Sequence, residues 1–316
     1  MKYILYGAGN KGKTDLNMLL EHNLEIIGFC DSNKAGSVVT SDAGEFSVYS
    51  VEEIRKEFKE DRDVKIIISI ANREEYVKVE KMLREEGFTV TEIERELYGD
   101  MNDKRINSRK YIAEYHIKEM DSYFKYAETE EGMHKFWGKD SVFYKMFVQL
   151  NLENVVELAC GRGRHVPEYI NEAKEIVLVD ILEKNISICK DKFKGDPRIC
   201  YYVNNGYDLN RLESDSYTAV FSYDAMVHFE MLDIFSYLKE IERILRPGGK
   251  ALIHHSNNTE DYRITFSTGT NGRNYMSADL FAHLGNRAGL EILDQQLIDW
   301  GGTKESDCLT LLEKPL

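Results

Sequence analysis

Proline is scarce in this sequence, and long hydrophobic runs are absent. Only 4 of the 316 residues are proline, whereas 42% are hydrophobic and 30% are charged. That mixture can fill a core, which excludes a wholly disordered or fibrous chain. No window approaches the ~20 consecutive apolar residues of a membrane-spanning helix, and the apolar stretch at residues 1–7 is too short for a signal peptide. We therefore expect a protein without a membrane span, long enough for two domains.

Cysteine pairs are absent as well. The five cysteines are odd in number, widely scattered and form no CxxC motif; they are Cys30, Cys160, Cys189, Cys200 and Cys308. This pattern argues against disulfides and against a metal site. It predicts reduced, mostly buried thiols in a cytoplasmic protein.

Basic residues are in deficit. Lys and Arg number 41 against 55 Asp and Glu, so the formal net charge is −14. An acidic surface repels the phosphates of nucleic acids and of anionic lipids. We therefore expect neither nucleic acid nor a membrane as a partner, and favour a small molecule as the substrate.

Residues 1–97 predict a first, small α/β domain. Strand patterns at residues 2–6, 25–30 and 64–70 alternate with helix patterns at residues 11–22, 51–58 and 74–86. This alternation predicts a small, mostly parallel Rossmann-like sheet of four or five strands. The following segment, residues 98–110, is polar and without periodicity, and is predicted to be a linker.

Residues 111–316 predict a second α/β domain. An aromatic-rich helical region at 111–149 comes first, and we interpret its rings as helix packing in preference to ligand contacts. The predicted strands are residues 155–159, 176–180, 199–203, 219–223, 251–255, 291–300 and 308–313. Only a few residues around Gly301 join the last two strands, so these two must pair antiparallel. We expect a parallel sheet with one reversed strand near its end.

A small-residue turn follows the first strand of this second domain. Gly161 and Gly163 stand in the sequence ELACGRGRH, where the absence of side chains lets the backbone turn sharply and approach a ligand. The next helix would offer its N-terminal N–H groups to a carboxylate. Glu157, at the end of the strand, can accept hydrogen bonds from an ammonium or hydroxyl group. The structural alternative is that the glycines serve only a tight turn.

Polar residues also end the next two strands. Asp180 closes the second strand, where a carboxylate with paired acceptors can bridge the two hydroxyls of a ribose. Asn204, Asn205 and Gly206 follow the third strand, and their amide groups and glycine can frame the edge of an adenine. Because these groups lie at the carboxyl ends of parallel strands, they are expected to meet at one edge of the sheet.

Four sequence segments together resemble a known family. ELACGRGRH, IVLVD, SYDAMVHF and LRPGGKALIHHS occur in that order. They and the reversed last strand resemble the class I S-adenosylmethionine-dependent methyltransferases, of the group that methylates small molecules and sugars, over about residues 120–316. The resemblance implies that Glu157, Gly161 and Gly163 hold the methionine moiety of the cofactor, Asp180 its ribose, and Asn205 with Gly206 its adenine.

Methyl transfer to a hydroxyl benefits from a base, and histidine is the natural base near neutral pH. His228 and Asp224 follow the fourth strand. His254 and His255 end the fifth strand, where alternation lets only one of them face the site, and we favour His255. We rank His228 first, with His255 and Asp224 behind it, and expect no metal. The alternative for each histidine is a structural hydrogen bond.

A second glycine-rich loop opens the chain. Gly7, Gly9 and Gly12 fit GxGxxG between a strand and a helix, and Asp31 ends the next strand, which is the context of a diphosphate-binding loop. YILYGAGNKGK and EIIGFCDSN resemble the small N-terminal Rossmann-like domain of bacterial sugar acetyltransferases, which binds a nucleotide-linked sugar. The resemblance implies a ligand site here; the alternative is a scaffold that makes homodimer contacts.

The sequence thus predicts transfer of a methyl group from S-adenosylmethionine to a hydroxyl of a sugar or sugar-nucleotide acceptor, for example in surface polysaccharide biosynthesis. Two other readings stay open. One is an NAD-dependent oxidoreductase that uses the first domain. The other is a non-catalytic scaffold that binds a sugar nucleotide.

Overall fold

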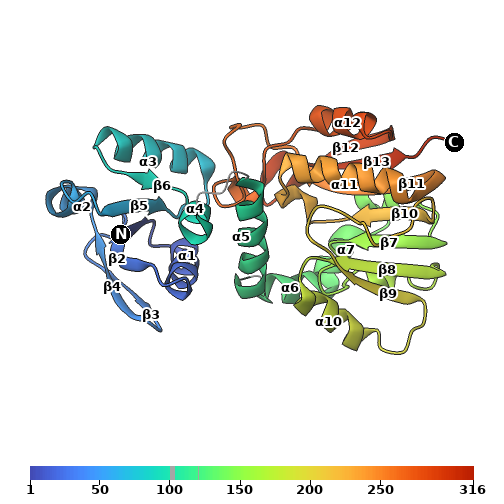
Figure 1. Cartoon of the computed structure of the whole chain (residues 1–316), viewed down its shortest axis with the longest axis horizontal. Coiled ribbons are helices and arrows are strands. Elements are labelled where there is room, and N and C mark those ends of the chain that lie inside the picture. Colours follow the sequence, from blue (N-terminus) through green and yellow to red (C-terminus); the bar gives the residue numbers. More distant parts are fainter. Residues whose placement is uncertain (100–103, 120) are drawn as a thin grey trace. The chain divides into compact units, whose positions relative to one another are not determined.

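A computed structural model of the chain describes residues 1–99, 104–119 and 121–316 (Figure 1). It has two compact units, each built on its own sheet. The first comprises Met1–Ser108 with Thr265–Gly272, and the second comprises Arg109–Ile264 with Arg273–Leu316. The predicted α/β fold class with two Rossmann-like sheets is confirmed.

The first unit holds a six-stranded sheet in the order β3-β4-β2-β1-β5-β6. Its strands are β1 (Lys2–Tyr6), β2 (Glu25–Cys30), β3 (Val38–Ser41), β4 (Gly44–Tyr49), β5 (Val64–Ile68) and β6 (Val90–Thr91), and its helices are α1 (Asn10–Glu21), α2 (Val51–Phe58), α3 (Arg73–Glu85) and α4 (Ile93–Tyr98). All neighbours pair parallel except β3 and β4, an antiparallel hairpin that the sequence patterns did not predict. Strand β1 lies between β2 and β5 and pairs parallel with both, so the loops that follow these three strands meet at one edge of the sheet.

The predicted linker at residues 98–110 lies in part outside the described residues, at 100–103. Tyr98 ends α4, and helix α5 (Lys104–Glu119) begins inside the segment. The division between the two units falls after Ser108.

The second unit holds a seven-stranded sheet in the order β12-β13-β11-β10-β7-β8-β9. Its strands are β7 (Asn154–Leu158), β8 (Glu175–Asp180), β9 (Ile199–Val203), β10 (Tyr217–Ser222), β11 (Leu245–Ser256), β12 (Glu291–Trp300) and β13 (Thr303–Glu313). Strand β13 runs antiparallel to both of its neighbours, and the other pairs are parallel. The predicted reversed strand is therefore confirmed.

Both faces of this sheet are buried, as a parallel sheet requires. Val155 and Leu178 pack into one core cluster, while Val156 and Val179 pack into the other, because successive strand residues point to opposite faces. Helices α10 (Glu183–Lys192), α11 (Met231–Ile244) and α12 (Ala278–Arg287) connect the strands. Each such aliphatic side chain, once fully buried, contributes roughly 1.5–3 kcal/mol.

Short helices precede the sheet: α6 (Asp121–Ala127), α7 (Glu130–Trp137) and α8 (Val142–Phe147). Thr129 and Ser141 cap α7 and α8 by accepting hydrogen bonds from Gly132 N and Tyr144 N. Phe143 and other rings of this region join the core of the second unit. In the described parts of the chain, no helix is long and apolar enough to span a membrane.

Candidate functional site

The turn after β7 adopts the tight geometry that its glycines predict. Ala159, Gly161 and Gly163 all have left-handed φ angles, of 58°, 55° and 68°. A Cβ on Gly163 would lie 2.6 Å from the ring of Phe193, so the turn packs directly on the residue that ends α10. The turn therefore ends β7 abruptly and leads into the short helix α9 (Val166–Tyr169).

Asp180 ties this turn to the end of β8. Its Oδ2 accepts a hydrogen bond of 2.9 Å from Gly161 N, and its Oδ1 accepts bonds from Leu182 N (2.8 Å) and Asn185 Nδ2 (3.2 Å). Burial raises the pKa of Asp180 to about 6, although these three bonds lower it. Carboxylate oxygens have about four acceptor positions, so the group can still accept from ligand hydroxyls.

A pocket opens at the carboxyl ends of β7, β8 and β9. It is lined by Arg109, Ile112, Ala113, Leu158, Ala159, Asp180, Ile181, Asn204, Gly206, Phe229, Glu230, Asp233 and Tyr237. The structure thus brings Asp180 and Gly206 together, as the sequence predicted. Apolar walls with a few polar groups at the edge suit a flat, partly polar ligand such as a nucleoside.

Asn205 does not take the predicted place. Its side chain is exposed, accepts hydrogen bonds from Tyr207 N and Asp208 N, and donates to Asp208 Oδ2 at 2.7 Å. Asn204 lines the pocket instead, with Nδ2 donating to the Tyr237 hydroxyl at 2.8 Å. Strand alternation explains the correction, since Asn204 lies on the same side of the chain as the buried Tyr202.

Glu157 is buried beside the turn and is only partly satisfied. Its Oε2 accepts a hydrogen bond of 2.7 Å from the Tyr169 hydroxyl, but Oε1 has no partner among the described residues. Burial raises the pKa of Glu157 to about 8, against the lowering effects of Tyr169 and of the charge on Arg164. A buried acceptor without a donor is costly, so Glu157 fits a ligand that brings one, such as an ammonium group.

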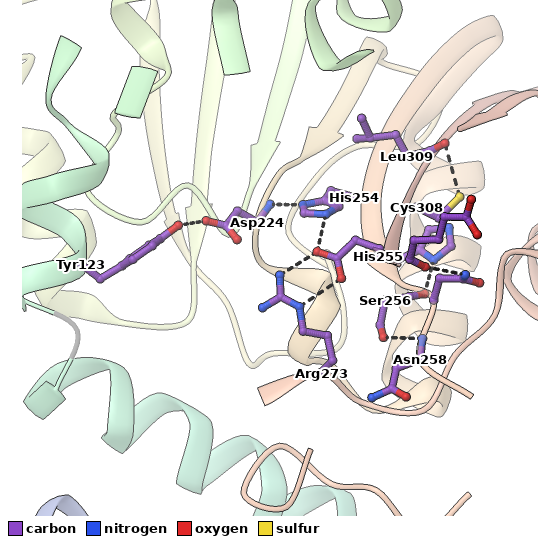
Figure 2. A network of polar contacts seen from close by, with 12 residues as sticks. Tyr123, Asp224, His254, His255, Ser256, Asn258, Arg273, Cys308 and Leu309 are labelled. Carbon is purple, nitrogen blue, oxygen red and sulfur yellow. Dashed lines mark hydrogen bonds and ion pairs between the residues drawn. The ribbon is translucent and has the colours of Figure 1, made fainter. Parts of the chain in front are cut away.

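Asp224 holds two side chains at the end of β10. Its φ is 57°. Its Oδ2 accepts a hydrogen bond from the Tyr123 hydroxyl (Figure 2) and another, of 3.0 Å, from Arg164 Nη2. Burial opposes ionisation, yet the charge of Arg164 and the contacts with His254 and Tyr123 hold the pKa of Asp224 below its usual value. A carboxylate committed in this way is a poor base, and the geometry gives Asp224 a positioning role.

His254 extends this network through the sheet (Figure 2). Its Nδ1 accepts a hydrogen bond of 3.0 Å from Asp224 N, and its Nε2 lies 3.0 Å from Asp307 Oδ2. Arg273 donates to both oxygens of Asp307, at 3.0 and 2.7 Å. The network was not foreseen from the sequence, because its members are separated by tens of residues along the chain.

The structure contradicts the choice of His255 over His254. His255 is fully buried and stacks on Phe281 of α12 with ring centroids 3.7 Å apart. Its Nδ1 lies 2.8 Å from Ser256 O and its Nε2 lies 2.8 Å from Thr310 Oγ1. Burial lowers the pKa of His255 to about 3. Both nitrogens are engaged on the α12 face, so His255 cannot take a proton from an acceptor bound at the end of β10.

His228 lies in the short helix η1 (Met226–His228), directly after β10. Its ring packs edge-on against the ring of His116 on α5, with centroids 5.8 Å apart, and its carbonyl accepts a hydrogen bond of 2.9 Å from Asn274 Nδ2. The neighbouring residues Phe229 and Glu230 line the pocket. His228 therefore directly precedes two pocket residues in the chain, and its role as the base stays a prediction.

In the first unit, the carboxylate of Asp31 binds the backbone of the glycine loop and of the turn that follows β2. Asp31 Oδ2 accepts a hydrogen bond of 2.9 Å from Ala8 N, while Oδ1 accepts from Asn33 N and Lys34 N. A Cβ on Gly12 would lie 1.9 Å from Gly7 O, so Gly12 packs helix α1 on the loop. The structure brings together the predicted residues Gly7, Gly9, Gly12 and Asp31, and Asp31, like Asp180, accepts three hydrogen bonds from nearby residues.

Metal ligands do not cluster in the described residues: no group of three or more His, Cys, Asp or Glu side chains there is placed to hold an ion.

Comparisons with known proteins give one family and several partial likenesses. A family model described as a methyltransferase domain matches residues 156–253. A chain from the complex between the Haloferax volcanii Trm112 methyltransferase activator and the putative methyltransferase is 19% identical, with a TM-score of 0.47 over 62% of this chain and 95% of that chain. The Burkholderia thailandensis 1,6-didemethyltoxoflavin-N1-methyltransferase is 15% identical, with a TM-score of 0.49 over 67% of this chain and 88% of that chain. No curated protein matches the sequence.

The family match covers the central part of the second unit. The matched residues run from within β7 to within β11. They include the glycine turn, Asp180, Asn204 and the segment after β10. Residues 156–253 therefore form a methyltransferase domain, with S-adenosylmethionine as its cofactor.

Proposed function

We propose that this protein transfers a methyl group from S-adenosylmethionine to a hydroxyl of a small, sugar-like acceptor. The observation that carries the proposal is the pairing of the pocket with the unpartnered Glu157 Oε1 beside the glycine turn. Together they offer one place for a nucleoside and one acceptor for an ammonium group. These are the two ends of the cofactor.

The residues present fit the cofactor. Asp180 would accept from the ribose hydroxyls, and Asn204 with the apolar pocket walls would hold the adenine. Glu157 and the backbone at Gly161 would hold the methionine end. The cofactor, when bound, supplies an electrophilic methyl group on a sulfonium; the protein's part is to align an acceptor with it and to remove the acceptor's proton.

A partly exposed aromatic ring supports a sugar-like acceptor. Trp300, at the end of β12, stacks on Phe136 with centroids 5.7 Å apart and an interplanar angle of 7°. Phe136 is buried in the core of the second unit, whereas Trp300 is partly exposed. The apolar face of a pyranose can pack on such a ring, and the resemblance of the first unit to sugar acetyltransferases favours the same class. Surface polysaccharide biosynthesis in the cytoplasm is the setting that we propose.

His228 is the proposed base. His254 and Asp224 hold each other, and His255 is engaged on the far face. His228 directly precedes the pocket residues Phe229 and Glu230 in the segment after β10, where a hydroxyl would meet the methyl group. Its ring would take the acceptor's proton as the methyl group arrives.

For the first unit we propose a supporting role, either in homodimer contacts or in holding the acceptor. The hydrogen bond from Ala8 N to Asp31 Oδ2 uses one of the loop N–H groups that a diphosphate would need, which favours support over diphosphate binding. Titration of the protein with a nucleotide-linked sugar tests the alternative: binding that is abolished by Asp31→Ala would make this unit a ligand site.

Calorimetric titration with S-adenosylhomocysteine tests the main proposal. The wild type should bind it, and Asp180→Ala should weaken binding at least about tenfold, since a hydrogen bond to a charged group is worth roughly 1.5–3 kcal/mol. Asp191→Ala, which removes an exposed carboxylate from α10, is the matched control. Absence of binding by the wild type overturns the proposal. Radiolabelled methyl transfer to a panel of sugars and sugar nucleotides then tests the acceptor class.

A further inference from the structure

Arg164 is a buried cation with an unused donor. It stands in the glycine turn, with its side chain only 10% exposed. Nη2 donates to Asp224 Oδ2 at 3.0 Å, but Nη1 is buried and has no acceptor among the described residues. A guanidinium presents its donors in a fixed planar fork, so engaging one arm does not satisfy the other.

A buried donor without an acceptor is destabilising, and native proteins contain few. The ion pair with Asp224 balances the charge of Arg164, but it leaves the buried Nη1 without an acceptor. An acceptor supplied by a ligand would explain both. Glu157 carries the opposite feature, a buried acceptor without a donor. It lies near enough for the charge of Arg164 to lower the pKa of Glu157.

The surroundings of Arg164 favour an anion. Its Cζ lies 5.3 Å from the ring centre of Phe136, which stacks on Trp300. Two further cations lie over Trp300: Arg273, at 5.4 Å, and Lys135, at 4.9 Å. Asp224 and Asp307 pair with the two arginines, whereas Lys135 has no carboxylate partner among the described residues. In a chain of net charge −14, these rings are thus bordered by an excess of positive charge.

We propose that Arg164 binds an oxyanion, a carboxylate or a phosphate, on a ligand held at the carboxyl end of β10. The inference rests on the proposed methyl transfer, and it specifies that one ligand of that reaction carries a negative charge. Arg164 Nη1 donates to the oxyanion while Nη2 keeps its bond to Asp224. Charge-assisted bonds of this kind are about twice as strong as neutral ones and fix orientation.

Two ligands of this site carry such a group: an anionic methyl acceptor and the α-carboxylate of the cofactor's methionine end. The first arm of the test compares S-adenosylhomocysteine with 5′-methylthioadenosine, which lacks the amino-acid end. If the cofactor is the source, Arg164→Gln weakens S-adenosylhomocysteine binding about tenfold or more and leaves 5′-methylthioadenosine binding unchanged. Arg246→Gln, the loss of an exposed arginine on β11, is the matched control.

The second arm uses protein saturated with S-adenosylhomocysteine. Inorganic phosphate, glucose 1-phosphate and glucuronate are titrated against neutral glucose, and Trp300 fluorescence in a Trp137→Phe background reports binding. If the acceptor is the source, the wild type binds an anionic probe about tenfold or more tightly than glucose, and Arg164→Gln removes that preference. Phosphate and glucuronate show which anion is preferred.

Asp224→Asn separates binding from structural support. Loss of the competing carboxylate should strengthen anion binding several-fold if Arg164 is the receptor. If Arg164 only supports the turn, the same change weakens every ligand. Arg164→Lys keeps the charge and should retain part of the affinity, and thermal melts confirm that each variant folds.

The proposal is overturned if Arg164→Gln weakens S-adenosylhomocysteine and 5′-methylthioadenosine equally while the wild type shows no preference for anionic probes. It is also overturned if the variant changes none of the affinities. Failure of the proposed function is a separate result, since it appears as wild-type protein that binds no S-adenosylhomocysteine.

Discussion

The backbone N–H of Asp224 donates a hydrogen bond of 3.0 Å to Nδ1 of His254. An imidazole nitrogen that accepts carries no proton, so the ring proton of a neutral His254 lies on Nε2, which donates to Asp307 Oδ2 at 3.0 Å. His254 thereby holds Asp224 in a left-handed conformation that few residues with a side chain adopt. One buried histidine thus fixes the carboxylate that orients Tyr123 (Figure 2) and Arg164.

Asp307→Asn should destabilise the protein by about 3 kcal/mol, because it removes the negative charge that pairs with the buried Arg273. Urea unfolding at pH 7 measures the change, with the exposed Glu291→Gln on β12 as control. The pKa of Asp307 is lowered to about 2, where His254 and Arg273 outweigh burial. Its stabilising contribution is complete above about pH 4 and falls as the pH drops toward 2. A difference between wild type and variant that does not shrink in this range contradicts the prediction.

Glu157→Gln should stabilise the ligand-free protein. The pKa of Glu157 is about 8 in the fold and about 4.5 when unfolded, so the fold binds the proton more tightly and loses stability as the pH rises from 4.5 to 8. A glutamine side chain does not ionise in this pH range. The free energy of unfolding of the variant should therefore exceed that of the wild type by on the order of 3 kcal/mol at pH 8 but by little at pH 5. Thermal melts at the two pH values measure it. An equal gain at both would show that packing, not ionisation, is the cause.

The binding of S-adenosylhomocysteine should release a proton from Glu157. At pH 7 a ligand-free Glu157 is mostly protonated, and an ammonium group arriving at Oε1 favours the carboxylate. Calorimetry with S-adenosylhomocysteine in two buffers of different ionisation enthalpy should show that the wild type releases close to one proton. Glu157→Gln should release much less. Equal release by both proteins would place the ammonium group away from Glu157.

Most of the fold could be predicted, because apolar runs such as β7 and β8 are buried on both faces and end at small or acidic residues. The hairpin β3–β4 could not, since its strands are short and mostly exposed and carry no clear alternation. The choice between His254 and His255 failed for another reason. Strand β11 continues to Ser256, and its face is set by β13, which lies more than 40 residues further along the chain. Sequence spacing contains no signal for such a long-range pairing.

Mutation of Asn204 tests whether this residue, and not Asn205, holds the adenine. Asn204→Ala removes a pocket residue whose Nδ2 donates to the Tyr237 hydroxyl and to Asp208 O. It should weaken S-adenosylhomocysteine binding by about 1–2 kcal/mol, through lost contacts and a loosened pocket wall. Asn205→Ala is the matched control, because its exposed side chain bonds only within its own turn. Calorimetric affinities that fall for Asn205→Ala and not for Asn204→Ala would restore the first assignment.

His228→Ala tests the proposed base. If the acceptor is a hydroxyl, its proton must leave as the methyl group arrives, and a positioned imidazole contributes about 10²–10⁴-fold to the rate. The variant should lose that factor in kcat with S-adenosylhomocysteine affinity nearly unchanged, and added imidazole should restore part of the rate. His255→Ala, by contrast, leaves Thr310 Oγ1 without its ring partner and opens a cavity against Phe281, so it should lower the melting temperature more than kcat. Near-full turnover by His228→Ala at pH 7 would make His228 structural. A loss of cofactor affinity without a loss of kcat would instead place its ring against the cofactor, since a base contacts only the acceptor.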